Sequence, residues 1–271
     1  MSRNNERTCI SAHQSLLESL ALHGRGVVSF SGAGGKTSLM FRLAKELSKI
    51  GEPVLTTTTT KIWMPTSNQS PAVIFAVSSQ ELLLKAKNIF QIHRHFSAGA
   101  GQVDSSKKIL GFPPDIVDEL WYSGEFQWIL VEADGAAGRA IKVPGPGEPV
   151  IPNCSTMVIG VVGLDAIGKP LDNRSVFRPE IFSTITGLAM GEPLTESVVA
   201  AAILHKEGMM KGAPTHADRL LFLNKADRPG ALERARKISV HLHKKAEKIG
   251  LKRVIIGQAE HEPPVVEFHS T

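Results

Sequence analysis

Cysteine and long apolar runs are both scarce in this chain of 271 residues. Its two cysteines, Cys9 and Cys154, lie far apart, which excludes the disulfide framework that small secreted proteins use. No run of about 18 or more apolar residues occurs, so the sequence predicts no transmembrane helix. The polar start, Met1 to Glu6, lacks the apolar stretch of a signal peptide. These absences predict a soluble protein of the reducing cytoplasm.

Positive charge is present in mild excess, with a formal net charge of +5 and an isoelectric point of about 9.2. The densest basic stretch, residues 234–248, has the pattern of a solvated helix face and carries no nucleic-acid-binding motif. We therefore expect neither nucleic acid nor a membrane as partner. A mildly basic surface suits ligands that carry phosphate groups.

Short apolar runs alternate with helical patterns along the chain, which is typical of βαβ units. The predicted strands are 26–31, 53–57, 72–77, 126–131, 157–162, 219–223 and 253–256. The predicted helices are 11–22, 36–50, 79–90, 114–121, 178–188, 195–208 and 229–249. We expect one α/β domain over residues 1–271, a P-loop NTPase-like three-layer fold with a mostly parallel, doubly wound sheet.

Three segments are predicted to be irregular. Residues 96–112, rich in Gly and Ser, have the composition of a loop or small hairpin, so a small insert is expected near 92–112. Residues 134–152 contain four Gly and four Pro, which excludes regular structure there, and the segment is long enough to be a functional loop. The tail, 260–271, is expected to be extended, or frayed unless it is docked.

The strongest motif follows the first predicted strand and opens the first long helix. Its residues are Gly32, Ala33, Gly34, Gly35, Lys36, Thr37 and Ser38. The glycines allow a tight turn whose N–H groups can face an anion, and the helix adds its positive end. Lys36 can reach the β- and γ-phosphates of a nucleotide, and the Thr37 hydroxyl can bind Mg²⁺.

The loop departs from the usual pattern G-x-x-x-x-G-K-[ST], because Phe30 stands where that pattern has its first glycine. The glycine at position 32 gives a shorter G-x-x-G-K-T. The beginning of the loop is therefore expected to differ from the usual form. The alternative is a Gly-rich turn without a ligand.

Two carboxylates follow the predicted strand 126–131, namely Glu132 and Asp134. A carboxylate at this end of a strand beside a phosphate loop is a candidate magnesium ligand. On the assumption that the two face opposite sides of an extended chain, only one would reach the ion. We predict Lys36, Glu132 and Asp134 as catalytic residues and Thr37, Glu132 and Asp134 as metal ligands. Solvated loop carboxylates are the alternative.

A base-reading motif follows the strand 219–223, with the residues Asn224-Lys225-Ala226-Asp227. This is N-K-x-D, the guanine-reading signature of GTPases. Asp227 would accept hydrogen bonds from the guanine N1–H and the exocyclic amine, which adenine cannot supply together. Asn224 would tie loops together, and the Lys225 stem would lie over the base. A chance helix-entry turn remains the alternative.

Two further segments supply candidate substrate or phosphate contacts. Thr58 and Lys61 belong to the threonine-rich segment 56–61, which could be a switch-like loop or a polar edge strand. Arg139, Lys142 and Glu148 lie in the loop 134–152, whose prolines limit its conformations. These side chains could contact phosphate or an anionic substrate, or could simply be solvated.

Several segments together resemble the YqeC-like accessory proteins of selenium-dependent hydroxylases. They are FSGAGGKTS, VLTTTTTKIW, ILVEADGAAGRAIKVPGPGEPVIP, VVGLDAIGKPL, VFRPE and LFLNKAD. The resemblance covers about residues 26–227. It implies a P-loop fold and a role in the maturation of a selenium-dependent molybdenum hydroxylase, with the apo-hydroxylase or its cofactor as partner. The family's HEPVIP has Gly147 in place of its His here, which puts any role of that His in doubt.

The sequence thus predicts Mg²⁺-dependent binding and hydrolysis of a nucleoside triphosphate, with GTP favoured over ATP. One alternative is a kinase or ligase-like enzyme that transfers a phosphoryl group to a small anionic substrate, since the short loop also occurs in amide-forming ligases. The other alternative is a non-catalytic scaffold that binds a nucleotide or a molybdenum cofactor.

Overall fold

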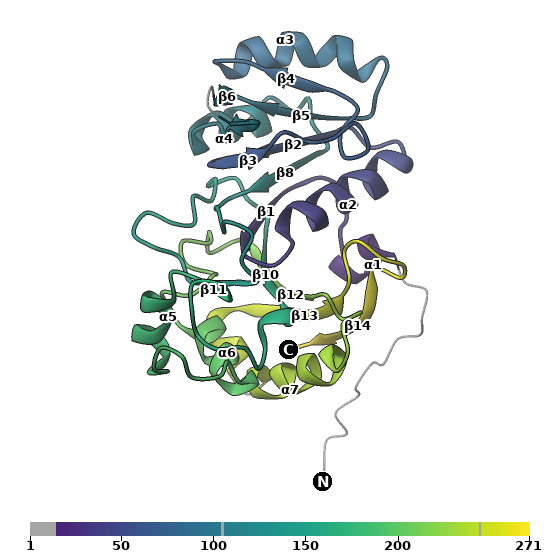
Figure 1. Ribbon diagram of the computed structural model, residues 1–271. Helices are drawn as coiled ribbons and strands as arrows, with labels where there is room; N and C mark the ends of the chain where they lie inside the picture. Colours follow the sequence, from purple (N-terminus) through teal and green to yellow (C-terminus); the bar gives the residue numbers. More distant parts are fainter. Residues whose placement is uncertain (1–14, 104–105, 244) are drawn as a thin grey trace.

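The computed structural model describes residues 15–103, 106–243 and 245–271 (Figure 1). Its main sheet has nine strands in the order β14-β13-β12-β10-β1-β8-β2-β5-β4. The bounds are β1 Gly26–Gly32, β2 Val54–Thr58, β4 Val73–Phe75, β5 His95–Gly99, β8 Trp128–Glu132, β10 Met157–Gly163, β12 Asp218–Asn224, β13 Leu251–Gly257 and β14 Val265–Ser270. All pairings are parallel except that of β13 with β14. The predicted α/β class with a mostly parallel sheet is confirmed.

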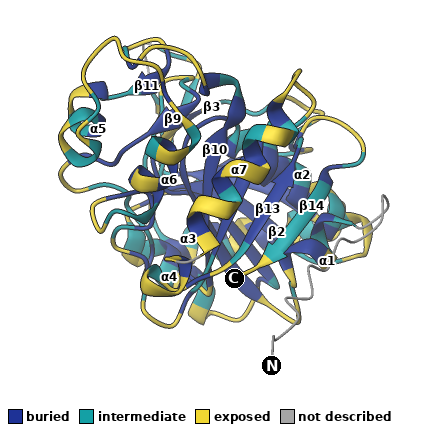
Figure 2. Cartoon of the chain, turned by 90° about the horizontal axis from the view of Figure 1, so that it is seen from below, coloured by how far each residue is buried: buried dark blue, intermediate teal, exposed yellow. Residues whose placement is uncertain are grey.

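Helices cover both faces of this sheet and make three layers (Figures 1 and 2). They are α1 Leu16–Leu20, α2 Lys36–Lys49, α3 Ser79–Phe90, α4 Pro114–Tyr122, α5 Pro179–Thr186, α6 Glu196–Leu204 and α7 Ala231–His243. Side chains alternate between the faces with period two. Val28 and Phe30 of β1 pack with α1 and α2, whereas Val27 packs with α3 and α4. The helices α5, α6 and α7 cover the same face as α3 and α4, over β10, β12 and β13. The chain therefore has the P-loop NTPase-like three-layer fold that the sequence predicts.

The expected loop or hairpin at 96–112 is wrong for residues 96–99. These residues belong to β5, a buried strand between β2 and β4. Two kinds of contact hold this strand. Phe96 and Ala98 pack in the core, and the Thr56 hydroxyl lies 2.6 Å from the Ser97 hydroxyl and 3.0 Å from His95 Nε2. Strands β6 Gly101–Val103 and β7 Lys108–Leu110 do form a hairpin, which pairs with β3 Lys61–Trp63 as a small antiparallel sheet.

Other differences concern element ends. The described helix α1 covers only 16–20 of the predicted 11–22, and residues 11–14 lie outside the described part. The predicted helix 229–249 divides into α7 and the 3₁₀ helix η2 Ala246–Ile249. The tail is not frayed: β14 closes the sheet beside β13. Among the described residues, no helix combines the length and apolarity that a membrane crossing needs.

Four neighbouring strands, β8, β1, β10 and β12, end at one edge of the sheet because they run parallel. The last residues of these strands and the loops that follow them carry the glycine-rich motif, the two carboxylates, η1 (Leu164–Ala166) and the N-K-x-D motif. The parallel topology thus brings these motifs together although they lie far apart in the sequence.

Candidate functional site

The loop between β1 and α2 needs glycine at two consecutive positions. Gly34 and Gly35 have φ values of 85° and 125°, which side chains rarely adopt. A Cβ on Gly34 would lie 2.3 Å from the Gly163 nitrogen, and one on Gly35 would lie 2.1 Å from the Asn224 amide nitrogen. The loop therefore packs tightly against the ends of β10 and β12.

The departure at position 30 has a structural explanation. Phe30 lies within β1 and is fully buried in the core beneath α2. The strand continues to Gly32, so the turn starts two residues later than the usual pattern requires. The Ala33 N–H then donates to the Val161 carbonyl at 2.8 Å.

The Lys36 ammonium lies at the centre of a buried group of charges. Its Nζ donates to the Gly32 carbonyl at 2.7 Å. It lies 3.1 Å from Asp134 Oδ1 and 3.8 Å from Glu132 Oε1. The side chains of Lys36 and Asp134 are 3% and 0% exposed, so both charges depend on protein partners rather than water.

The expectation that Glu132 and Asp134 face opposite sides is wrong, because both contact the same ammonium. Residues i and i+2 of an extended chain share a face, so the period of two in fact places them together. Asp134 Oδ2 also accepts the Gly32 N–H at 3.2 Å. The carboxylates therefore act as one unit with the phosphate loop.

Glu132 is bound from the helix side by Thr37, whose hydroxyl donates to Oε2 at 2.6 Å. Burial raises the pKa of Glu132 above its ordinary value, and the nearby Lys36 ammonium and Thr37 hydroxyl only partly offset this effect. An added positive charge beside Glu132 would favour its ionised form.

These residues fit a magnesium ion. Thr37, Glu132 and Asp134 supply only oxygen donors, which Mg²⁺ prefers. Asp134 Oδ1 is buried and accepts no hydrogen bond, although the Lys36 ammonium is close. Within the described residues, no group of three or more His, Cys, Asp or Glu has the spacing of a complete protein metal site. A bound ion would therefore need further oxygen ligands, as magnesium bound to phosphate has.

Lys142 lies on β9 (Ile141–Lys142) and continues the row of paired, buried charged side chains on the side away from the phosphate loop. Its ammonium lies 3.2 Å from Asp134 Oδ2 and 2.7 Å from Glu148 Oε2, and it donates to the Gly135 carbonyl at 2.6 Å. Burial alone would raise the pKa of Glu148, but hydrogen bonds from Arg178 and Lys142 outweigh it and lower that pKa to about 2.

Arg178 completes this chain of alternating charges, and the sequence did not single it out as a site residue. Its guanidinium contacts Glu148 at 2.5 and 3.2 Å. Arg178 has φ 62° and ψ 64°, and it precedes α5 directly after β11 (Val176–Phe177), which pairs with β9. Arg178 lies in VFRPE, one of the segments that carry the resemblance to the YqeC-like family. Only the pairing of β9 with β11 brings this residue to Glu148.

The other candidate contacts have local partners. Arg139 donates to the backbone carbonyls of Ala137 and Asn173. Thr58 donates to the Glu132 carbonyl at 2.7 Å from β2, which lies inside the sheet, so the alternative of a polar edge strand is wrong. Lys61 lies exposed on β3, opposite Leu110.

The N-K-x-D motif is tied to the phosphate loop by Asn224. Its amide nitrogen donates to the Gly34 carbonyl at 2.8 Å, and its amide oxygen accepts the Ala259 N–H at 2.9 Å. Lys225 donates to Asp165 at 3.0 Å. Asp227 lies 3.6 Å from Arg228 and 3.8 Å from His261. Asn224 thus fixes the positions of three loops relative to one another, and Ser38 adds a bond of 2.7 Å to Glu260.

Several solved structures resemble this fold at low sequence identity. MinD from Aquifex aeolicus is 12% identical with a TM-score of 0.43, covering 85% of this chain and 81% of MinD. HypB from Helicobacter pylori, solved with nickel, is 12% identical with a TM-score of 0.36, covering 88% and 80%. FtsY from Mycoplasma mycoides is 10% identical with a TM-score of 0.36. That match covers 91% of this chain but 63% of FtsY, less than two thirds of its length.

Sequence comparison is more specific. The model of the YqeC protein family matches residues 28–180. The YqeC protein of Escherichia coli (strain K12) is 37% identical over 205 residues, which cover 73% of this chain and 75% of that protein. The matched residues include the phosphate loop, both carboxylates and the loop from Asp134 to Pro152. The chain therefore belongs to the YqeC family.

Proposed function

We propose that this protein binds a nucleoside triphosphate with Mg²⁺ and hydrolyses it, with GTP favoured over ATP. The observation that carries this proposal is the contact of Lys36 and Thr37 with two carboxylates at a strand end. Thr37 lies 2.6 Å from Glu132, and Lys36 lies 3.1 Å from Asp134. An isolated glycine turn would have no reason to bury these charges.

In this proposal, the loop amides of 32–37 and the Lys36 ammonium hold the phosphates. Thr37 and Glu132 would hold magnesium, and Asp134 would assist them or orient the attacking water. Bound magnesium would supply positive charge against the phosphate oxygens. Catalysis would come from positioning and charge stabilisation, which preorganised groups in a buried site perform well.

The preference for GTP rests on Asn224 and Asp227. Asn224 fixes the N-K-x-D loop against the phosphate loop, so a bound triphosphate would place its base at a defined distance. The Asp227 carboxylate, with 26% of its side chain exposed, could accept two hydrogen bonds from guanine. The alternative of a chance turn does not explain why Asn224 contacts two other loops.

The test of hydrolysis compares two lysines of the same helix. Lys36→Ala should abolish phosphate release and triphosphate binding, whereas Lys45→Ala, exposed on α2, should retain both. Circular dichroism checks that Lys36→Ala still folds, because the variant leaves two buried carboxylates without their ammonium. Equal turnover of wild type and a folded Lys36→Ala variant would reject the assignment.

The biological role proposed is the maturation of a selenium-dependent molybdenum hydroxylase, on the strength of the family resemblance. The test is complementation of cells that lack the protein. Wild type and Lys45→Ala should restore hydroxylase activity and hydroxylase-bound selenium, and Lys36→Ala should not. Full hydroxylase activity in cells without the protein would refute this role while leaving nucleotide hydrolysis intact.

A kinase or ligase-like reaction is favoured by one observation, the partly exposed Arg178 beside Lys142 and Glu148. The Arg178 side chain is 33% exposed and retains N–H donors that an anionic acceptor could use. Product analysis separates the reactions. A kinase step yields a phosphorylated acceptor and no free phosphate, whereas a ligase step yields a new amide together with free phosphate, and simple hydrolysis yields free phosphate alone. Nucleotide binding without any turnover, even with the apo-hydroxylase present, would instead support a scaffold.

A further inference from the structure

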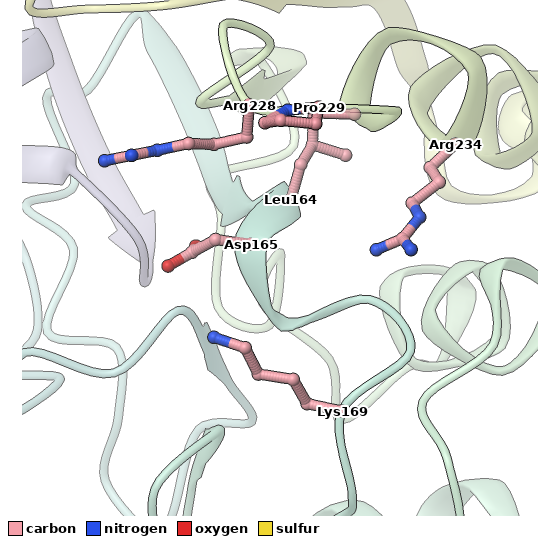
Figure 3. A pocket seen from close by; sticks show the side chains of 7 residues that line it. Leu164, Asp165, Lys169, Arg228, Pro229 and Arg234 are labelled. Atoms are coloured by element: carbon pink, nitrogen blue, oxygen red, sulfur yellow. The ribbon is translucent and has the colours of Figure 1, made fainter.

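A separate pocket of about 340 Å³ lies between the loop after β10 and the beginning of α7 (Figure 3). It is lined by Leu164, Asp165, Lys169, Arg228, Pro229, Ala231 and Arg234. Figure 3 shows the charged ends of Asp165, Lys169 and Arg228 extending in the same direction, with Arg234 approaching from α7. None of these residues belongs to the phosphate loop, and Glu132 and Asp134 are not among them.

The charge in this pocket is positive after its internal pairs are counted. Asp165 is paired with Lys225 at 3.0 Å, and Arg228 lies 3.6 Å from Asp227. In the part of the chain that the structure describes, no carboxylate oxygen lies within 4.0 Å of the charged nitrogens of Lys169 or Arg234. Arg234 instead donates to the Ile167 carbonyl, which uses one of its N–H groups but supplies no opposite full charge.

The backbone adds to this positive field. Helix α7 begins at Ala231, which lines the pocket, so the positive end of the helix dipole lies at its wall. Together with the Lys169 and Arg234 side chains, this end of α7 makes the pocket a suitable place for an anion.

We propose that this pocket binds a small organic phosphate, separately from the triphosphate held by the phosphate loop. The volume exceeds the needs of a bare phosphate ion and lies at the lower end of the range for small-molecule sites. Leu164 and Pro229 offer apolar surface to the organic part, while Lys169 and Arg234 bind the phosphate and Arg228 lies at the other side of the pocket. Arg supports two parallel hydrogen bonds to such a group.

The position of the pocket suggests communication with the nucleotide. Asp165 lines the pocket and also binds Lys225, and Arg228 lines it and lies beside Asp227. A phosphate that attracts Arg228 would draw it from Asp227 and leave that carboxylate freer to accept from a base. The organic phosphate should therefore strengthen GTP binding without competing with it.

The experiment is calorimetric titration with ribose 5-phosphate, performed with and without saturating GTP and Mg²⁺. We expect binding in both conditions and about tenfold weaker binding to Lys169→Met, since one charged hydrogen-bond donor is lost. Lys169 is exposed, so this variant should fold; Lys45→Met is the matched control and should bind as wild type does. Lys36→Ala should also retain ribose 5-phosphate binding, even though it loses GTP.

Three results would overturn the proposal. The first is no binding of ribose 5-phosphate in either condition, and the second is equal affinity for wild type and Lys169→Met. The third is competition with GTP together with loss of binding in Lys36→Ala, which would place the ribose 5-phosphate in the phosphate loop. Because the titration without GTP does not depend on triphosphate binding, it tests the pocket even if the proposed hydrolysis fails.

Discussion

The two sides of the candidate site differ in how far their charged side chains are buried. The phosphate side consists of Lys36, Glu132, Asp134, Lys142 and Glu148, of which all but Glu148 are almost fully buried. The base side consists of Lys225 and Asp227 with their ion-pair partners Asp165 and Arg228, which keep substantial exposure to water.

This contrast teaches how much each side constrains the fold. Buried charges lose their hydration, so each requires a partner, and loss of one partner leaves the other unsatisfied. Exposed pairs are screened by water and contribute little to stability. Substitutions on the phosphate side should therefore alter folding as well as function, whereas those on the base side should alter only ligand choice.

The largest effect is expected for Lys142→Met. The ammonium is completely buried between Asp134 and Glu148, so its removal leaves two carboxylates with less compensation. The free energy of unfolding should fall by about 3–5 kcal/mol, as for other buried pairs that lose one partner. Chemical denaturation measures it, with the exposed Lys61→Met as control, expected within about 0.5 kcal/mol of wild type. A similar small change for both variants would erase the contrast between buried and exposed charge.

In the proposed magnesium site, hydrolysis of GTP depends on the Thr37 hydroxyl. Thr37→Ala should reduce kcat/KM for GTP by about a hundredfold, because charge stabilisation at the phosphates is lost. It should also raise the magnesium concentration that gives half-maximal turnover. Thr37→Ser retains the hydroxyl and should stay within a few-fold of wild type. Equal losses in both variants would show that the methyl group matters and that the hydroxyl does not bind the ion.

The core at the opposite edge of the sheet should respond to acid through His95, the first residue of β5, which is 4% exposed and hydrogen-bonded to Thr56. Burial lowers the pKa of His95 to about 4 from an ordinary 6.5. As the pH falls below 6.5, the His95 imidazole becomes protonated in the unfolded chain, whereas in the folded chain it stays neutral until about pH 4. Stability is therefore lost across this window and is unaffected above it.

At pH 5 this loss should be about 2 kcal/mol relative to pH 7. Denaturation of wild type and His95→Gln at the two pH values measures it, and the variant should lack this part of the pH dependence. The comparison uses the change with pH, because Gln alters packing at both values. Parallel pH profiles would mean that His95 is protonated in the fold or exposed to solvent.

The strands of the main sheet differ in how well the sequence predicts them. The strands β1, β8, β10 and β12 were predictable because each is a short apolar run followed by a distinctive motif. Strand β5 was not, since HFSAG alternates between two environments: Phe96 and Ala98 pack in the core, whereas His95 and Ser97 pair with Thr56 of the neighbouring strand. Local pattern cannot reveal a strand whose stability depends on a distant partner.

The site shows the same limit. Spacing in the sequence predicts that Lys36, Glu132 and Asp134 belong to one site, and the structure brings the three side chains together. The expectation that the two carboxylates diverge was wrong, because residues i and i+2 of a strand share a face. Arg178 could not be assigned, because its contact with Glu148 depends on the pairing of β9 with β11, two strands of two residues each. Long-range pairing of such short strands leaves almost no trace in the sequence.

The smallest effect is expected on the base side, where Asp227→Asn should leave stability unchanged and alter only ligand choice. The substitution replaces a carboxylate oxygen by an amide that donates a hydrogen bond. Xanthine carries a carbonyl where guanine carries its exocyclic amine, so the variant should lose about tenfold in affinity for GTP and gain affinity for xanthosine triphosphate. Calorimetry with both nucleotides, beside denaturation curves, tests both halves of this statement. Unchanged affinity for GTP, or tighter binding of ATP by wild type, would mean that Asp227 does not contact the base. A large loss of stability would instead place Asp227 among the buried charges and remove the distinction between the two sides.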